Sequence, residues 1–390
     1  MTCWVPGASG SLFDVDNLPY GVFSRPGEDP RVGVRIGDFV VDLAPIAAAE
    51  MLDVHHVFQE SSLNALMAEG RVVRESVRRW VTGFLSDETE RDLVEPSLLA
   101  LSEVTLHLPV EVADYVDFYA SVDHAANVGR IFRPDQEPLL PNWKHLPVGY
   151  HGRAGTVVGS GTPIVRPSGQ RRSDPGPAFG PSARLDIEAE LGFVVGVGSS
   201  LGTPVSYSAF ADHVFGVVGL NDWSARDIQA WEYVPLGPFL GKSFATSISH
   251  WVTPLEALSA AWVPLHAQDP EPLPYLGPGD TQGLDISVEV VVNGSVISRP
   301  PYRTMYWSPA QMLAHLTVNG ASLRTGDLYG SGTISGPSED SRGSLLEIGW
   351  GDESAFLADG DEVVLRYTAP SASGGRLALG EVAGRIEPAA

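Results

Sequence analysis

The segment from Leu185 to Leu191 alternates strictly between apolar and acidic residues, and this alternation constrains the fold more than any other feature of the chain. A period of two is typical of a β-strand, so the carboxylates of Asp186, Glu188 and Glu190 are expected to share one face. Neighbours on that face lie roughly 6–7 Å apart, because a strand rises about 3.3 Å per residue. Like charges at this spacing repel one another and resist burial. The face is therefore either open to water or covered by something positive.

A second acidic site, Asp222, follows an apolar stretch and opens a segment that we predict to be helical from 221 to 233. Asp222, Arg226, Gln229 and Tyr233 are spaced there by four, three and four residues. At about 100° per residue these positions fall on one stripe of a helix. An acid, a guanidinium, an amide and a phenol on one stripe indicate a functional site rather than a plain surface.

Carboxylates at these positions suit hard cations, because calcium and magnesium prefer oxygen ligands. The sequence has no His-Glu-x-x-His motif, no cysteine spacing for zinc and no EF-hand loop. Asp117, Glu188, Glu190 and Asp222 could supply a shell of oxygen ligands. The residues alone leave a second interpretation open, which is a solvated acidic strand face in a protein that is acidic throughout.

Three further residues have side chains suited to catalysis. A histidine such as His124 can act as a base near neutral pH. Glu347 lies in the apolar stretch Ser344–Ile348, predicted to be a strand, where a buried acid needs a partner such as a histidine. Lys242 lies in an apolar, glycine-rich stretch and could face a developing anion. The alternatives are a packed histidine, a glutamate that faces water and a lysine whose stem covers apolar surface.

Charge and composition limit the partners and the compartment. The formal net charge of −23 makes nucleic acid and anionic membranes poor partners for the bulk surface. Cys3 is the only cysteine, so no intrachain disulfide can form, which fits a reducing compartment. We find no signal peptide and no apolar run of about 18 residues that could span a bilayer. A cytoplasmic protein without membrane or nucleic-acid partners is therefore expected.

Periodicity and composition divide the chain near residue 109. The first part combines short strands with helices, and the second is rich in aromatic residues, histidine, arginine and glycine as far as Trp251. An Asn293-Gly294 turn of type I′ is expected between two strands. The predicted strands are Arg31–Ile36, Phe39–Leu43, Leu284–Val292, Val296–Ser298 and Glu362–Tyr367, and the predicted helices of the first part are Leu63–Ala68, Val72–Leu85 and Leu93–Leu101.

Four segments carry distinctive motifs: Asn17–Phe23, Pro141–Trp143 through His151–Ala154, Asn221–Phe244 and Ser331–Gly336. They resemble signatures of the fumarylacetoacetase family, and the resemblance covers nearly the whole chain. It implies a β-rich α+β fold, with a small SH3-like N-terminal domain at 1–109 and a large mixed β-roll catalytic domain at 110–390. It also implies a homodimer.

The resemblance also implies roles for individual residues. Calcium or magnesium would bind Asp117, Glu188, Glu190 and Asp222, leaving Asp186 without a ligand role. A second, magnesium-type site would use Asp222, Lys242 through its main-chain oxygen, and Thr246. His124 would be the proton acceptor and Glu347 its orienting acid, and oxyanion donors would be Arg226, Gln229 and Lys242. Substrate contacts would come from Tyr119, Arg133, Tyr150, Gln229, Tyr233 and Thr333.

The activity implied by the resemblance is hydrolysis of a carbon–carbon bond in a small dicarboxylate β-diketone. The family converts 4-fumarylacetoacetate to fumarate and acetoacetate, the last step of tyrosine and phenylalanine catabolism. One departure is Asp123, which stands before His124 where the family pattern has glutamine, and which is expected to move the pH optimum. The alternatives are a related acylpyruvate hydrolase, keto-acid decarboxylase or isomerase, and, more remotely, a non-catalytic calcium-stabilised scaffold.

Overall fold

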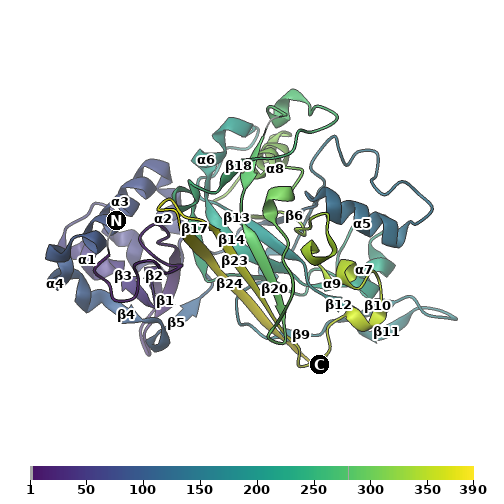
Figure 1. Cartoon of the computed structure of the whole chain (residues 1–390), viewed down its shortest axis with the longest axis horizontal. Helices are drawn as coiled ribbons and strands as arrows, with labels where there is room; N and C mark the ends of the chain where they lie inside the picture. Colours follow the sequence, from purple (N-terminus) through teal and green to yellow (C-terminus); the bar gives the residue numbers. More distant parts are fainter. Residues whose placement is uncertain (1–2, 280) are drawn as a thin grey trace.

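The computed structural model describes residues 3–279 and 281–390. One long mixed β-sheet runs through the molecule and links a smaller N-terminal part to a larger C-terminal part (Figure 1). The two parts therefore share hydrogen-bonded strands. Along the main path of this sheet the order is β4 (Leu98–Ala100), β3 (Phe39–Asp42), β2 (Arg31–Ile36), β1 (Tyr20–Ser24), β17 (Trp251–Pro254), β14 (Val214–Asp222), β13 (Ala189–Val195), β22 (Leu328–Gly330), β6 (Tyr115–Phe118) and β7 (Gly149–His151).

Strand β17 joins the two parts of the sheet. It pairs with β1 on one side, where Tyr20 lies opposite Val252, and with β14 on the other. One buried hydrophobic cluster contains side chains from both parts. The domain boundary predicted near residue 109 falls between β5 (Thr105–His107) and β6, and it remains a prediction.

A second, five-stranded sheet packs against the centre of the first. The hydroxyl of Tyr367 in this sheet donates a 2.9 Å hydrogen bond to the carbonyl of Leu220 in β14. Gly219 makes the close approach possible, because a Cβ there would lie 2.3 Å from the Tyr367 ring. The order is β21 (Ser295–Ser298), β20 (Ser287–Val292), β23 (Glu362–Pro370), β24 (Arg376–Glu387) and β9 (Ile164–Val165).

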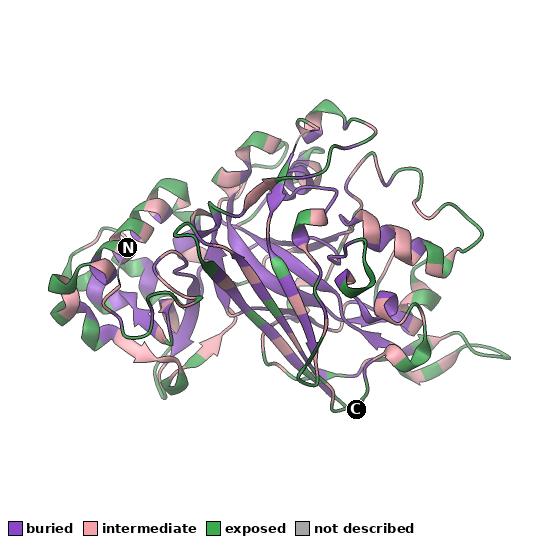
Figure 2. Ribbon diagram, in the orientation of Figure 1, coloured by how far each residue is buried: buried purple, intermediate pink, exposed green. Residues whose placement is uncertain are grey.

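The central strands are buried along their whole length. Every residue of β13 and β14 is buried, and Figure 2 shows these strands inside a shell of partly exposed helices. The apolar run of β14 is continuous, as expected for a strand covered on both faces. The acidic residues carried by these two strands therefore lie in the protein interior.

Most of the predicted elements are confirmed. The helices predicted at Leu63–Ala68 and Val72–Leu85 match α2 (Asn64–Ala68) and α3 (Gly70–Ser86). Asn293 and Gly294 have φ values of 50° and 78°, as a type I′ turn between β20 and β21 requires. Among the residues that the structure describes, no helix has both the length and the hydropathy needed to cross a bilayer.

Three predicted elements are wrong. The helix predicted from Leu93 to Leu101 ends at Val94 in α4 (Arg91–Val94), because Leu98–Ala100 pairs with β3 as strand β4. The helix predicted from residue 221 begins only at Arg226, since the preceding residues complete β14 and a short strand.

The strand predicted around Glu347 is a short helix, α9 (Leu345–Ile348). The Ser344 side chain caps this helix by accepting a hydrogen bond from the main-chain N–H of Glu347. N-cap hydrogen bonding of this kind starts a helix even in an apolar segment that reads as a strand.

A buried arginine fixes α3 to the C-terminal part. The guanidinium of Arg74 donates to Glu256 at 2.9 Å, and to the carbonyls of Val214 at 2.9 Å and Ala211 at 3.3 Å. It also lies 5.6 Å from the ring of Phe215. Arg74 therefore has partners for its charge and its donors although its side chain is only 4% exposed.

Arg74→Ala is expected to lower the free energy of unfolding by about 3 kcal/mol, because it leaves Glu256 and two carbonyls without their buried partner. Denaturant unfolding measures the change. Arg71→Ala is the control on the same helix, since Arg71 forms exposed pairs, with Glu75 at i,i+4 and with Asp212 at 3.5 Å, and we expect less than about 1 kcal/mol. Equal losses in the two variants would contradict this role for Arg74.

Candidate active site

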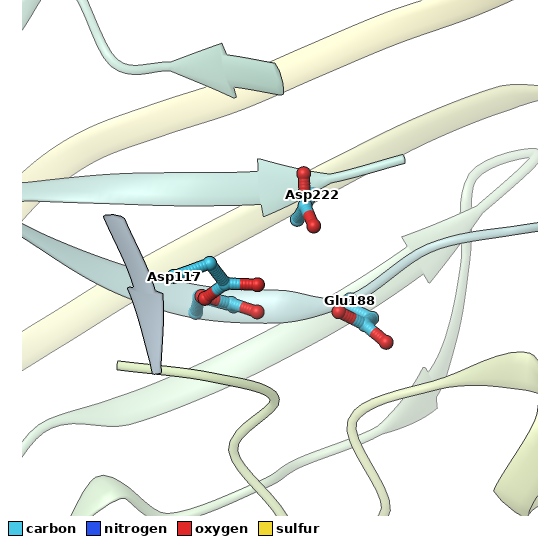
Figure 3. Close-up of side chains that lie close together, drawn as sticks. Asp117, Glu188 and Asp222 are labelled. Carbon is cyan, nitrogen blue, oxygen red and sulfur yellow. The ribbon is translucent and has the colours of Figure 1, made fainter. Parts of the chain in front are cut away.

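Four buried carboxylates converge from neighbouring strands. Asp117 comes from β6, Glu190 from β13, Asp222 from the end of β14, and Glu188 from the residue before β13. One oxygen from each lies within 4.8 Å of the others. Figure 3 shows three of them, Asp117, Glu188 and Asp222, gathered around one region. All four are at most 5% exposed, so the interpretation as an acidic face open to water is wrong.

The alternating apolar and acidic segment Leu185–Leu191 does not form one continuous strand, because it is interrupted at Glu188. The segment forms two strands, β12 (Leu185–Asp186) and β13, with residues 187–188 between them. The carboxylate of Asp186 accepts hydrogen bonds from Arg226 and from the main chain of Leu345 and Leu346. The expectation that all three acids share one face is therefore wrong for Asp186, because the break gives it separate partners.

Two cations lie beside the acid cluster. The ammonium of Lys242 donates to Glu188 and, at 2.8 Å, to Asp222, and Arg226 donates to Glu188 at 2.7 Å. Burial raises the pKa of Glu188, but Lys242 and Arg226 outweigh it and hold that pKa well below its usual range. Glu188 is therefore ionised and fully paired.

On the other side of the cluster, no cation among the described residues forms an ion pair with Asp117 or Glu190. Burial, together with repulsion from Asp222, raises the pKa of Asp117 well above its usual range. Burial and repulsion from Asp117 do the same for Glu190. Asp117 Oδ1 and Glu190 Oε1 are buried and, within the part of the chain that the structure describes, have no hydrogen-bond partner.

This arrangement fits a hard divalent cation. Buried carboxylate oxygens without donors are the ligands that calcium and magnesium prefer. Gly330 keeps the space beside them open, since a Cβ there would lie 2.8 Å from Glu190 Oε2 and 2.9 Å from Asp117 Oδ1. The buried carboxylate cluster of Asp117, Glu188, Glu190 and Asp222 can therefore hold a metal ion.

A histidine and a glutamate are paired next to this cluster. His124 lies in α5 (Val122–Phe132), and its Nδ1 is 2.7 Å from Oε2 of Glu347 in α9. The ring of Tyr119, two residues after Asp117, meets the imidazole edge-on at 5.2 Å between centroids. Tyr119 thus connects the His124 side of the site to the strand that supplies Asp117.

The carboxylate of Glu347 is held in its ionised form. It accepts hydrogen bonds from Asn127 at 3.0 Å, Ser335 at 2.9 Å and Ser344 at 2.8 Å, in addition to His124. Burial raises the pKa of Glu347, but the positive charge that His124 carries when protonated and the hydrogen bonds from His124, Asn127 and Ser344 outweigh it and lower the pKa. An ionised carboxylate can only accept, so Nδ1 of His124 donates and Nε2 is left free to accept a proton.

The predicted stripe of Asp222, Arg226, Gln229 and Tyr233 is wrong as one helix face. In α7 (Arg226–Glu232) the guanidinium of Arg226 does contact the amide oxygen of Gln229, at 3.3 Å. Asp222 belongs to a strand, however, and Tyr233 is the C-cap of α7 with 46% exposure. Arg226 Nη2 is buried and has no hydrogen-bond partner among the described residues, so this donor is free for a ligand.

The other predicted site residues differ in how closely they join the cluster. Tyr150 and Thr246 donate to Asp222, at 3.1 Å and 2.8 Å. The buried hydroxyl of Thr333 has no partner within residues 3–279 and 281–390. Arg133 is half-buried and donates to the carbonyl of Pro138 at 3.1 Å. The second, magnesium-type site remains a prediction. The ammonium of Lys242 has no acceptor for a cation, so Lys242 could contribute only its main-chain oxygen.

Some residues of the site were not predicted. Asn127, Ser335 and Ser344 all hydrogen-bond to Glu347. Asn127 follows His124 by three residues, which places both on one side of a helix, so helical spacing could have found it. Ser335 and Ser344 approach from loops, and no local periodicity indicates such contacts.

Cation binding is expected to release protons, because burial and repulsion from neighbouring carboxylates raise the pKa values of Asp117 and Glu190 and favour their protonated forms until a cation is bound. Isothermal titration of metal-free protein with calcium, in buffers of different ionisation enthalpy and at several pH values, measures the number released. We expect fewer protons at higher pH, where these groups are already ionised. A heat that is independent of the buffer at every pH would contradict the raised pKa values.

Comparison with known proteins shows the same likeness along the whole chain. The family model for the fumarylacetoacetase N-terminal domain matches residues 16–109, and that for the fumarylacetoacetate hydrolase C-terminal domain matches residues 114–386. The fumarylacetoacetase of Rattus norvegicus is 45% identical over 414 residues, covering 99% of each chain. That of Homo sapiens is 44% identical over 416 residues, again covering 99% of each. The Caenorhabditis elegans protein is 45% identical over 417 residues and covers 100% of each.

Solved structures share the fold. A fumarylacetoacetate hydrolase from Exiguobacterium antarcticum superimposes with a TM-score of 0.57 at 18% identity, covering 95% of this chain and 99% of that chain. A maleylpyruvate hydrolase from Sphingobium superimposes with a TM-score of 0.55 at 17% identity, covering 95% and 100%. The predicted class, a sheet-rich α+β chain with a smaller N-terminal and a larger C-terminal domain, is confirmed.

Proposed function

The chain belongs to the fumarylacetoacetase family, and from this membership we propose that it is a metal-dependent hydrolase that cleaves 4-fumarylacetoacetate to fumarate and acetoacetate. This reaction ends tyrosine and phenylalanine catabolism. The observation that carries the proposal is the buried His124–Glu347 pair, 2.7 Å apart, beside four converging carboxylates. A non-catalytic scaffold would need neither this pair nor its three supporting donors.

We propose that His124 is the general base. Its Nδ1 donates to ionised Glu347, which fixes the tautomer and leaves Nε2 to take a proton from water. The hydroxide adds to a ketone carbon of the substrate and forms a tetrahedral oxyanion. When this intermediate collapses, the carbon–carbon bond breaks, its electron pair leaves as an enolate, and the proton held on His124 returns to the enolate carbon.

Arg226, Gln229 and Lys242 are the proposed donors to the oxyanion. The free Nη2 of Arg226 supports this role, because a buried donor without a partner has a site for a ligand oxygen. Lys242 keeps positive charge close by, although its ammonium is directed at Glu188 and Asp222. Removing one oxyanion donor in other enzymes costs about 3–4 kcal/mol of transition-state stabilisation.

A divalent cation held by Asp117, Glu188, Glu190 and Asp222 would polarise the ketone and offset the enolate charge. We propose calcium, with magnesium as the alternative, because the ligand set consists of oxygen atoms alone. A second, magnesium-type site at Asp222, Thr246 and the main-chain oxygen of Lys242 is proposed on the family resemblance only.

The substrate carries two carboxylates that need donors. We propose that Arg133, Tyr119 and Tyr150 hold them, since arginine suits bidentate binding of a carboxylate and phenols donate singly. The hydroxyl of Tyr150, which donates to Asp222 at 3.1 Å in the free protein, would turn to the substrate. The buried, unpartnered hydroxyl of Thr333 is a further donor. Tyr233 is exposed and would need to move toward the site, as lids and loops do on substrate binding.

A homodimer and a cytoplasmic location are also proposed on the family resemblance. Size-exclusion chromatography with light scattering would test the first, since a mass near 83 kDa is expected for two chains of 41.6 kDa each. Cell fractionation would test the second. Recovery as a single chain of 41.6 kDa at working concentration would contradict the dimer.

Purified protein is expected to consume fumarylacetoacetate, measured as loss of its absorbance, and to lose this activity after chelation. Calcium or magnesium should restore it, because buried oxygens of Asp117 and Glu190 have no hydrogen-bond partner among the described residues and a cation would supply positive charge there. Acylpyruvate substrates are the matched comparison and should react far more slowly. Preference for an acylpyruvate would favour a related enzyme of the superfamily, and full activity in metal-free protein would refute the metal role.

His124→Ala is expected to lower kcat by about 1,000-fold, since general-base catalysis contributes about 10² to 10⁴ in other enzymes. Calcium binding should persist, because His124 is not among the four carboxylate ligands. Titration calorimetry and steady-state kinetics measure the two effects. His56→Ala, at an exposed position of the N-terminal part, is the control and should retain normal turnover. Ordinary turnover by His124→Ala would remove this residue as the base.

A further inference from the structure

Asp186 is fully buried, yet it belongs neither to the cation cluster nor to the His124–Glu347 pair. We propose that Asp186 is a positioning residue that holds Arg226 and Glu347 in a fixed relation to each other. The inference rests on the proposed function and extends it to a residue that does not touch the substrate.

Each carboxylate oxygen of Asp186 accepts two hydrogen bonds. Oδ1 accepts hydrogen bonds from the main-chain N–H groups of Ile187 and Leu345, each at 2.7 Å. Oδ2 accepts from the N–H of Leu346 at 3.1 Å and from Arg226 Nε at 2.7 Å. Four donors around two oxygens require a group that only accepts, which an ionised carboxylate provides.

Each side of this contact leads directly to a proposed catalytic group. Leu345 and Leu346 are the first two residues of α9, and Glu347 is the third. Arg226 is the first residue of α7. Besides its contact with Asp186, its Nη1 donates to Glu188 in the cation cluster at 2.7 Å. The carboxylate of Asp186 thus connects α9, which carries the acid that orients His124, to the guanidinium of Arg226, which contacts the cation cluster.

The charge of Asp186 matters as well as its shape. Arg226 is buried, with a side chain 6% exposed, and its two carboxylate partners are Asp186 and Glu188. Glu188 also pairs with Lys242 and belongs to the proposed cation site. Asp186 is therefore the carboxylate that neutralises the charge of Arg226 without belonging to the proposed cation site. Arg226 can keep its orientation through Asp186 when Glu188 binds a cation.

A matched control exists in the N-terminal part. Asp42 is also a buried aspartate, 3% exposed, that binds an arginine and the start of a short helix. It accepts from Arg31 Nε at 2.9 Å and from the N–H of Ala44 at 3.3 Å. Asp42→Asn therefore removes the charge of a buried, arginine-binding aspartate away from the proposed active site.

Asp186→Asn keeps the shape but puts an NH₂ group against N–H donors. We expect kcat for fumarylacetoacetate to fall by about 10- to 100-fold, as for other residues that orient catalytic groups, while KM changes much less. Asp42→Asn should leave both constants unchanged, although it loses similar thermal stability. Asp186→Glu keeps the charge and should recover part of kcat.

The double variant Asp186→Asn/Glu347→Gln separates positioning from general stability. If Asp186 acts through Glu347, the combined loss of kcat is smaller than the product of the two single losses. Asp42→Asn/Glu347→Gln should show simple multiplication. Independent effects of Asp186 and Glu347, or a folded Asp186→Asn with normal kcat, would overturn the proposal.

If Asp186→Asn does not fold, the same measurements are made on Asp186→Glu, whose oxygens are displaced by one methylene. Normal kcat in that folded variant would also overturn the proposal. Failure of the proposed function looks different, because the unaltered protein would then not consume fumarylacetoacetate, and the inference would fall with it.

Discussion

The burial of several carboxylates at one point is the interaction on which this site depends. Isolated buried charges are costly, so each acid must be protonated, paired with a cation or bound to a metal. Glu188 and Asp186 pair with protein cations, whereas none of the residues that the structure describes forms an ion pair with Asp117 or Glu190. The protein therefore supplies only part of the positive charge that its own acids need, and this deficit is the physical basis of a metal site.

The two halves of the site are supported in different ways. The acids of the cation cluster come from one sheet, in which β14 pairs with β13 and β22 lies between β13 and β6, and Glu188 immediately precedes β13. The backbone ladder fixes the spacing of these strands. The base and its partner come from two short helices, and side-chain hydrogen bonds hold Glu347 in place. Rigid strands suit ligands that must converge on one point, while a network of donors suits a carboxylate that must stay ionised.

The sequence predicts the chemistry of this site better than its local shape. The motifs around Asp222 and Ser331 lead to the family, and with it to the four acids and to His124 and Glu347. Periodicity fails at Glu347 because Ser344 starts a helix in an apolar segment. It also fails at Asp186, whose partners at Leu345 and Leu346 are about 160 residues away in the chain. Contacts of that range depend on tertiary packing, which no window of sequence contains.

The shared sheet has a consequence for how the two domains can be separated. Strand β17 has β1 on one side and β14 on the other, and β14 ends at Asp222. Cutting the chain after β5 would leave β17 as a bare edge next to the strand that carries Asp222. Unprotected edges invite pairing between molecules, so the N-terminal strand β1 covers an edge that the larger domain would otherwise expose.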